Sequence, residues 1–175
     1  MVVIRPRTIH DLPDCIVALR EVHEIDGYPA VWPEDPAGWL APSKFVATLV
    51  AEIDGAVVGQ VGLGDSAIPA AVQRMLPNTQ LISVIRLYVA PPSRGHGVGM
   101  RLLDAAAATA EALQRKPVLN VETGAAAAIA LYERTGWMRV HSQPDGWTTP
   151  DGRAAFLHHY VGPSPDRRPQ QAPGS

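Results

Sequence analysis

Residues 80–104 read QLISVIRLYVAPPSRGHGVGMRLLD, and this stretch predicts a strand, a glycine-rich turn and a helix in succession. The first part, Leu81–Val89, is dense in the β-branched and aromatic residues that favour strands. The middle, Arg94–Gly99, has glycines on alternate positions, which permit positive φ angles and let the backbone approach a ligand closely. The helix that follows points its free N–H groups and the positive end of its dipole at this turn. The stretch therefore predicts an anion site, most naturally for phosphate.

The spacing of the glycines excludes two common nucleotide-binding loops. A dinucleotide fingerprint that begins at Gly95 needs a glycine where Met100 stands, and one that begins at Gly97 needs a glycine where Leu102 stands. A P-loop needs Lys followed by Ser or Thr at the start of the helix, and this chain has no such pair there.

The same turn resembles the pyrophosphate loop of the GNAT superfamily, the acyl-CoA-dependent N-acetyltransferases. The pattern of that loop is Gln or Arg, two residues, Gly, one residue, and Gly or Ala. Arg94, Gly97 and Gly99 occupy these places. The residues before them, Leu87–Pro91, give the Leu-Tyr-Val-x-Pro strand end that the family also shows.

A second segment, residues 125–137, resembles the family's Asn-x-x-Ala-x-x-Leu-Tyr-Glu-x-x-Gly-Phe/Trp pattern. The matching residues are Ala128, Leu131, Tyr132, Glu133, Gly136 and Trp137. The opening Asn is replaced by Ala125, which the resemblance implies weakens the hold on the cofactor. With two motifs in the family's order, the chain is identified as a GNAT member.

Composition and charge narrow the class of protein. The chain has 175 residues, 46% of them hydrophobic, a net charge of −2 and a single cysteine, Cys15. We expect one domain over residues 1–162, followed by a flexible proline-rich tail over residues 163–175. The chain offers neither a broad basic surface nor an apolar run of about 20 residues, so nucleic acid and membrane are not expected partners. A reducing cytoplasm fits a lone cysteine, which we interpret as a small buried hydrophobe.

The periodicity of the remaining chain predicts alternating strands and helices. The Asp54-Gly55 pair predicts a tight hairpin, and residues 146–152 a loop. We expect helices at about 11–24, 97–116 and 125–134, a short helical turn at 35–40, and strands at 2–4, 45–52, 56–63, 81–89, 117–122, 137–140 and 154–161. The sequence does not settle residues 64–79, where a short helix at 67–75 is one interpretation.

The resemblance implies an α/β (α+β) fold with a mixed, mostly antiparallel sheet of six to seven strands and helices on both faces. In the family, two neighbouring parallel strands splay apart to admit the pantetheine arm of acetyl-CoA. These strands correspond here to Leu81–Val89 and residues 117–122, and no metal is implied.

The resemblance also implies which residues hold the cofactor. Backbone groups of Leu87, Tyr88 and Val89 would bind the pantetheine, with an N–H near Val89 facing the thioester oxygen. The pyrophosphate would lie on N–H groups of the turn, and the cofactor would also touch the start of the second motif. The residues of these two parts are Arg94, Gly95, His96, Gly97, Val98, Gly99, Met100, Ala125 and Ala128.

For catalysis, the family's tyrosine falls on Tyr132, which would protonate the departing thiolate. Some members have a carboxylate as general base twelve residues earlier, where this chain has Asn120, which can hold a water but cannot act as a base. We expect Glu24 to serve as base through a water. His158 and His159 are expected to be solvated or structural.

The loop over residues 27–43 mixes prolines and aromatic rings, and burial and cation–π contacts there would suit an amine. We expect Asp26, Tyr28, Trp32 and Arg86 to bind the acceptor; rings that merely cap the core are the alternative for this loop.

The function expected is therefore N-acetylation of a small-molecule primary amine by direct attack in a ternary complex with acetyl-CoA. A protein N-terminal or lysine acetyltransferase and a non-catalytic acyl-CoA-binding module are the alternatives. The sequence leaves a homodimer open.

Overall fold

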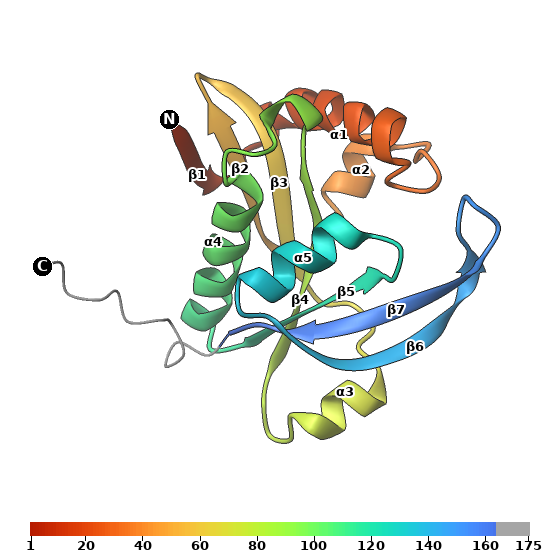
Figure 1. Ribbon diagram of the computed structural model, residues 1–175. Helices are drawn as coiled ribbons and strands as arrows, with labels where there is room; N and C mark the ends of the chain where they lie inside the picture. The colour runs from red at the N-terminus through yellow and green to blue at the C-terminus, as the bar shows by residue number, and fades with distance from the viewer. Residues whose placement is uncertain (164–175) are drawn as a thin grey trace, which may run out of the picture.

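In the computed structural model, which describes residues 1–163, seven strands form one sheet in the order β1-β2-β3-β4-β5-β7-β6 (Figure 1). All neighbouring strands are antiparallel except β4 and β5. The strands are β1 (Val2–Pro6), β2 (Phe45–Ile53), β3 (Ala56–Gly64), β4 (Leu81–Val89), β5 (Lys116–Glu122), β6 (Met138–Thr148) and β7 (Ala154–Val161). This mixed, mostly antiparallel sheet is the predicted fold class.

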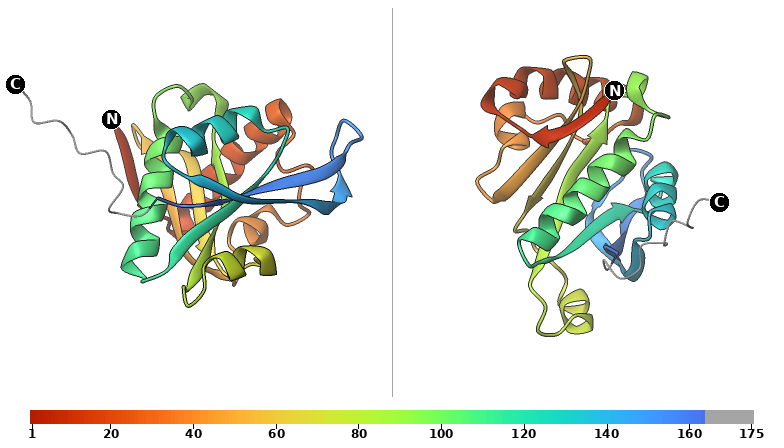
Figure 2. Two further views of the ribbon diagram at one scale, coloured as in Figure 1. Left: turned by 60° about the horizontal axis from the view of Figure 1, so that its bottom comes forward. Right: turned by 90° about the vertical axis from the view of Figure 1, so that its left-hand side faces the viewer.

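Helices cover both faces of the sheet (Figure 2). Side chains of α4 and α5 pack with β2–β5 in the largest apolar cluster, whereas α1 and α2 pack on the opposite face, here called the α1 face, and α3 covers β5 and β7 there. The helices are α1 (Leu12–Asp26), α2 (Pro36–Leu40), α3 (Ala70–Met75), α4 (Val98–Ala112) and α5 (Ala126–Arg134), with 3-10 turns η1 (Ile9–Asp11) and η2 (Pro91–Ser93). None of the helices in residues 1–163 is long and apolar enough to cross a membrane.

The parallel pair β4–β5 is joined only at one end. Its register covers Leu81–Ser83 against residues 116–118, and beyond the Ser83–Val118 pair the two strands diverge (Figure 1). The other edge of β5 is paired with β7 from Val118 to Glu122. The predicted splay is therefore present, and it leaves one edge of β4 and one edge of β5 facing an unpaired gap.

A bulge interrupts β4 beside this gap. Gly62 on β3 lies opposite Ile85 and Gln60 lies opposite Tyr88, so two residues of β4 oppose one residue of β3. The first of the two, Arg86, has a φ angle of +56°, in the left-handed region. Bulges change the direction in which a side chain points and increase the local twist of the strand.

Two predicted boundaries on β6 were wrong. The strand was expected to end at Val140 and to be followed by a loop over residues 146–152, but β6 continues to Thr148. Its pairing with β7 reaches Thr148 opposite Ala154, across an irregularity after Pro144. β6 is the edge strand of the sheet, so no strand pairs with its outer side. A proline, which lacks an N–H, is tolerated in such a strand. The predicted tail lies, from residue 164 on, outside the described residues.

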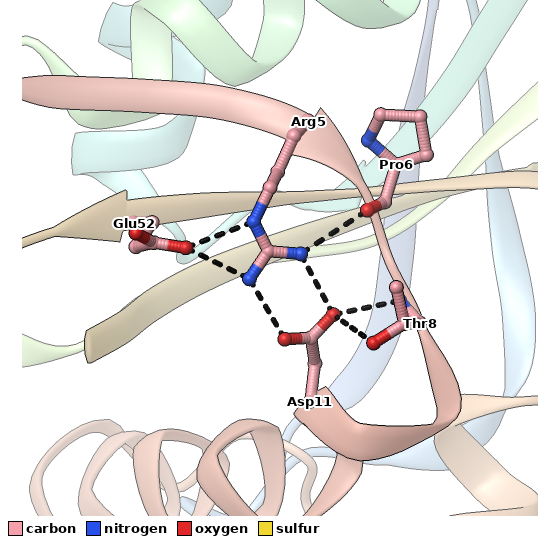
Figure 3. A network of polar contacts seen from close by, with 5 residues as sticks. All are labelled: Arg5, Pro6, Thr8, Asp11 and Glu52. Carbon is pink, nitrogen blue, oxygen red and sulfur yellow. Dashed lines mark hydrogen bonds and ion pairs between the residues drawn. The ribbon is translucent and has the colours of Figure 1, made fainter. Parts of the chain in front are cut away.

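A charged network joins β1, β2 and the start of α1 (Figure 3). The guanidinium of Arg5 donates two hydrogen bonds of 2.8 Å to Asp11 and one of 2.8 Å to Glu52. Asp11 also accepts from the backbone N–H of Thr8, at 2.6 Å. The hydrogen bonds from Arg5, together with those from Thr8, hold the pKa of Asp11 well below its usual range.

We expect Asp11→Asn to lower the free energy of unfolding at pH 7 by about 2 kcal/mol, because it weakens charge-assisted hydrogen bonds of a buried carboxylate. The folded-state pKa of Asp11 lies below that of an unfolded chain, roughly 3.9, so its stabilisation is present above that pH and is lost as the pH falls further. Denaturant titrations should therefore show a difference between wild type and variant that shrinks below about pH 4. Asp104→Asn, on the exposed side of α4, is the control, and an equal loss there would contradict the assignment.

Candidate active site

The turn between β4 and α4 presents a row of free backbone N–H groups. Gly95 and Gly97 have φ angles of +81° and +74°, and Gly97 is the N-cap of α4. Within residues 1–163, the N–H groups of residues 95–100 donate no hydrogen bond to another backbone group. A Cβ on Gly97 would meet only Cε of Met100, at 3.9 Å, so the space around it is open. The turn can therefore bind an anion on its N–H groups.

The edge of β4 that faces the gap carries further free backbone groups. The N–H of Ala90 donates to the carbonyl of Val58 on β3, at 2.7 Å. Because backbone groups alternate between the two edges of a regular strand, the N–H group of Val89 points into the gap. Leu87 lies in the bulge, where this alternation is interrupted. The same alternation directs the backbone groups of Tyr88 to β3. Tyr88, which was expected to bind pantetheine through its backbone, is thus turned toward β3.

The Tyr88 side chain instead supports the α1 face. It is buried, and its hydroxyl donates to the carbonyl of Cys15 on α1, at 2.9 Å. Cys15 is itself fully buried, and burial raises the pKa of its thiol to about 11. Cys15 is therefore a packed, protonated residue of this cluster.

Tyr132 lies on α5, next to the start of α4. A Cβ on Gly99 would come within 3.2 Å of Cδ2 of Leu131, so the two helices are in close contact beside the turn. Tyr132 is 8% exposed, and its ring lies among those of Trp137 and Tyr160. Burial raises the pKa of its hydroxyl, which therefore stays protonated at neutral pH. This hydroxyl forms no hydrogen bond within residues 1–163.

Three polar residues form a row across β5, β7 and β6. Asn120 lies directly opposite His159, and His159 lies opposite His141, with the two imidazole centroids 5.7 Å apart. Val118, two residues before Asn120, packs against Val72 of α3. Since strand side chains alternate between faces, this polar row (Asn120, His159 and His141) lies on the α1 face.

His159 is the buried member of the polar row. It is 6% exposed, and its Nε2 has no hydrogen-bond partner within residues 1–163. Burial lowers its pKa and His141 lowers it further, whereas the weaker effects of Asp145 and His158 raise it and lower it, respectively. His159 is therefore neutral at pH 7 and able to accept a proton. Its neighbour His158 points to the other face, where its Nδ1 is 2.6 Å from Oγ of Ser142.

Arg86 occupies the β4 side of the gap on the same face. Its guanidinium carbon lies 4.1 Å from the ring centroid of Trp39 and 5.4 Å from that of Phe45. The Trp39 ring also meets the ring of Tyr28 edge-on, at 6.1 Å. Although Tyr28 is 38% exposed as a whole, burial of its hydroxyl raises its pKa to about 12, partly offset by Arg86. These four residues are called the Arg86 cluster.

Sequence comparison decides the family. A sequence model of the GNAT acetyltransferase domain matches residues 44–139, a range that includes both motifs. The chain belongs to the GNAT family of acetyltransferases. It is thus an N-acetyltransferase that uses acetyl-CoA. A search of curated protein sequences gives no match.

Solved acetyltransferase structures resemble this GNAT chain over nearly its whole length. Ribosomal-protein-alanine N-acetyltransferase from Brucella melitensis is 26% identical, with a TM-score of 0.70 over 91% of this chain and 98% of that one. NAA60 from Arabidopsis thaliana in complex with acetyl-CoA is 16% identical, with a TM-score of 0.72 over 92% and 97%. YncA from Salmonella typhimurium with its cofactor acetyl-CoA is 21% identical, with a TM-score of 0.69 over 98% and 99%. At 16% and 21% identity, the last two structures show similarity of fold only.

The donor side of this GNAT enzyme fits acetyl-CoA. The free N–H groups of residues 95–100 suit a pyrophosphate, and the unpaired edge of β4 offers donors and acceptors to an extended amide-bearing arm. Ala125 and Ala128 pack at the margin of the core beside this region, and Ala125 caps α5 without a side-chain hydrogen bond. No metal-binding group of three His, Cys, Asp or Glu side chains occurs within residues 1–163.

Three of the predicted site residues lie away from the gap or are otherwise engaged. Glu24 is exposed, on the side of α1 opposite the stripe of buried residues that faces the sheet. Asp26 forms an ion pair with Arg94, with Oδ1 3.2 Å from Nη1, and so joins the end of α1 to the turn. Trp32 lies under the guanidinium of Arg20, at 4.3 Å, and packs against the apolar cluster under α1.

We expect Gly97→Val to weaken binding of CoA at least tenfold, because a branched side chain at a left-handed position distorts the N–H groups that hold the pyrophosphate. Gly55→Val is a matched control, since Gly55 has a φ angle of +82° in the remote β2–β3 turn and also has open space around it. Both variants should lose roughly 1–2 kcal/mol of stability through backbone strain. Calorimetric titration with CoA should separate them, and equal affinities would show that the turn is not the pyrophosphate site.

Proposed function

We propose that this enzyme acetylates the primary amine of a small molecule, by direct attack of the amine on acetyl-CoA in a ternary complex. The observation that carries the proposal is the unpaired gap between β4 and β5. The free backbone N–H groups of the turn lie at one end of it, and the polar row and the Arg86 cluster lie on its α1 face. Acetyl-CoA supplies the acetyl group, and CoA leaves as the free thiol. The chain's own residues bind both partners and move the protons.

The proton of the amine needs an acceptor. An ordinary primary amine has a pKa near 10, so only about one part in a thousand is neutral at pH 7. We assign this role to His159, which takes the proton through a water held by Asn120, the exposed side chain opposite it. A neutral imidazole with a lowered pKa is suited to this role. Glu24, on the far side of α1, is the competing assignment.

The departing thiolate needs a proton, and Tyr132 can supply it. Burial keeps its hydroxyl protonated, and the preceding residue, Leu131, contacts the start of α4, where we place the cofactor. The N–H of Val89, which points into the gap, is the donor available to the negative charge that develops on the acetyl oxygen. Such a donor is worth roughly 3 to 4 kcal/mol.

A small acceptor is favoured over a protein by two features. Asn120 stands where the ribosomal-protein acetylases resembled by this chain have a carboxylate, and the rings of Tyr28 and Trp39 close over the α1 face beside Arg86. The similar structures include protein acetyltransferases and a putative phosphinothricin N-acetyltransferase, so both acceptor classes occur among them.

Release of CoA thiol from acetyl-CoA should be measured with a panel of amino acids, other small amines, aminoglycosides and peptides. We expect the highest kcat/KM with a small amine, and Tyr132→Phe should lower kcat roughly ten- to a hundredfold, with little change in KM for acetyl-CoA. Peptides that surpass every small amine would overturn the assignment of the acceptor. Activity unchanged in Tyr132→Phe would remove the proposed acid.

His159→Gln should lower kcat roughly a hundredfold, at the low end for general acid–base catalysis. His158→Gln and Glu24→Gln are matched controls and should retain near wild-type rates. Because the pKa of His159 is lowered, the wild-type kcat should fall only below about pH 6.5, where the imidazole gains its proton. This acidic limb should disappear in His159→Gln. A loss confined to Glu24→Gln would instead identify Glu24 as the base.

A further inference from the structure

Arg86 is a partly buried cation without a counter-charge. It forms no hydrogen bond and no ion pair within residues 1–163, and its Nη1 is buried without a partner. Four other arginines within residues 1–163 have carboxylate partners: Arg5, Arg94, Arg115 and Arg153. The Arg86 guanidinium instead lies over the rings of Trp39 and Phe45.

This arrangement is costly to the folded protein. Burial of a guanidinium disfavours its charge and lowers the pKa of Arg86, though not enough to deprotonate an arginine at neutral pH. The residue also holds a left-handed φ angle of +56°, which is strained for a side chain of this size. Strain and unpaired buried polar atoms concentrate where a ligand supplies the missing contact.

The position of Arg86 indicates which ligand supplies the missing contact. Arg86 lies three residues beyond Ser83 on β4, and Asn120 lies two residues beyond Val118 on β5, where Ser83–Val118 is the last pair before the strands diverge. At about 3.3 Å per residue, the two side chains flank the gap about 10 and 7 Å beyond that pair, both on the α1 face. The pyrophosphate turn lies past the far end of β4, so the anion on Arg86 is not a cofactor phosphate.

We propose that the acceptor amine carries a carboxylate, that Arg86 binds this carboxylate, and that the acceptor is therefore an amino-acid-like molecule whose amine is directed toward Asn120. This inference rests on the proposed function and narrows its acceptor class. A planar guanidinium with unused N–H donors matches a carboxylate in geometry and charge. The Trp39 ring under the guanidinium fixes its plane for that contact.

The test measures binding rather than turnover. CoA-saturated enzyme is titrated calorimetrically with L-amino acids grouped by side-chain class, with their carboxamides, and with the corresponding decarboxylated amines. The best-binding acid should bind about ten- to a hundredfold more tightly than its carboxamide and its decarboxylated amine, as expected for a charge-assisted pair. In Arg86→Met this preference should fall to about one, while the affinity for CoA is unchanged.

Arg20→Met is the matched control, because Arg20 also stacks on a tryptophan but lies exposed on the outside of α1. It should keep the full preference for the acid. Arg86→Lys retains a cation at the same backbone position, so it should keep part of the preference if Arg86→Met fails to fold. Equal binding of acid and carboxamide to wild type, or no binding of any acid, would overturn the proposal. Binding of acids without their acetylation would instead contradict the proposed function and leave the carboxylate site standing.

Discussion

The separation of β4 from β5 after a single short run of parallel pairing is the constraint on which the rest of this structure depends. Two neighbouring strands that stay hydrogen-bonded leave no room for a ligand, whereas here pairing stops at Ser83 and Val118. Unpaired backbone groups are costly when buried, so the divergence is stable only because other elements hold the strands apart. On one side β4 remains paired with β3, and on the other β5 remains paired with β7.

The two faces of the sheet differ in how their apolar cores are built around this gap. On one face, α4 and α5 build a continuous apolar core, in which Leu102, Leu103 and Tyr160 are fully buried. On the α1 face, the apolar cluster under α1 and α2 is separate from the one under α3. Polar and charged side chains thus concentrate on the face where the core is divided. This division lets the enzyme bury groups such as His159 without disrupting its main core.

Much of the donor side could be predicted from sequence, because it is local. The glycine turn, the strand before it and the helix after it lie within about twenty-five consecutive residues, and their spacing matches a known loop. The position of Glu24 could also have been judged correctly, since the helical period places it opposite Cys15 and Val22. The role given to it followed instead from Asn120, which stands where members of the family have a carboxylate and so left the base to be sought among other side chains.

The acceptor side could not be predicted in the same way, because it depends on register between distant strands. His159 became a candidate only when β7 placed it opposite Asn120, and no local pattern specifies that pairing. Arg86 faces the aromatic rings because a bulge shifts β4 by one residue, and a regular strand pattern gives no sign of it. The length of β6 was missed for a related reason, since Pro144 and Gly146 are typical of loops but are tolerated on an edge strand.

The insertion of β7 between β5 and β6 has a consequence for the order in which the enzyme assembles. Residues 2–112 contain β1–β4 and α4, which pair and pack with one another, so these contacts can form while synthesis of the later strands continues. The free side of β5 is completed only by residues 154–161, so β5 must wait, with one edge exposed, until those residues emerge. The binding turn can therefore mature early, whereas the strand that carries His159 arrives last. During that interval the open edge of β5 can pair with another strand.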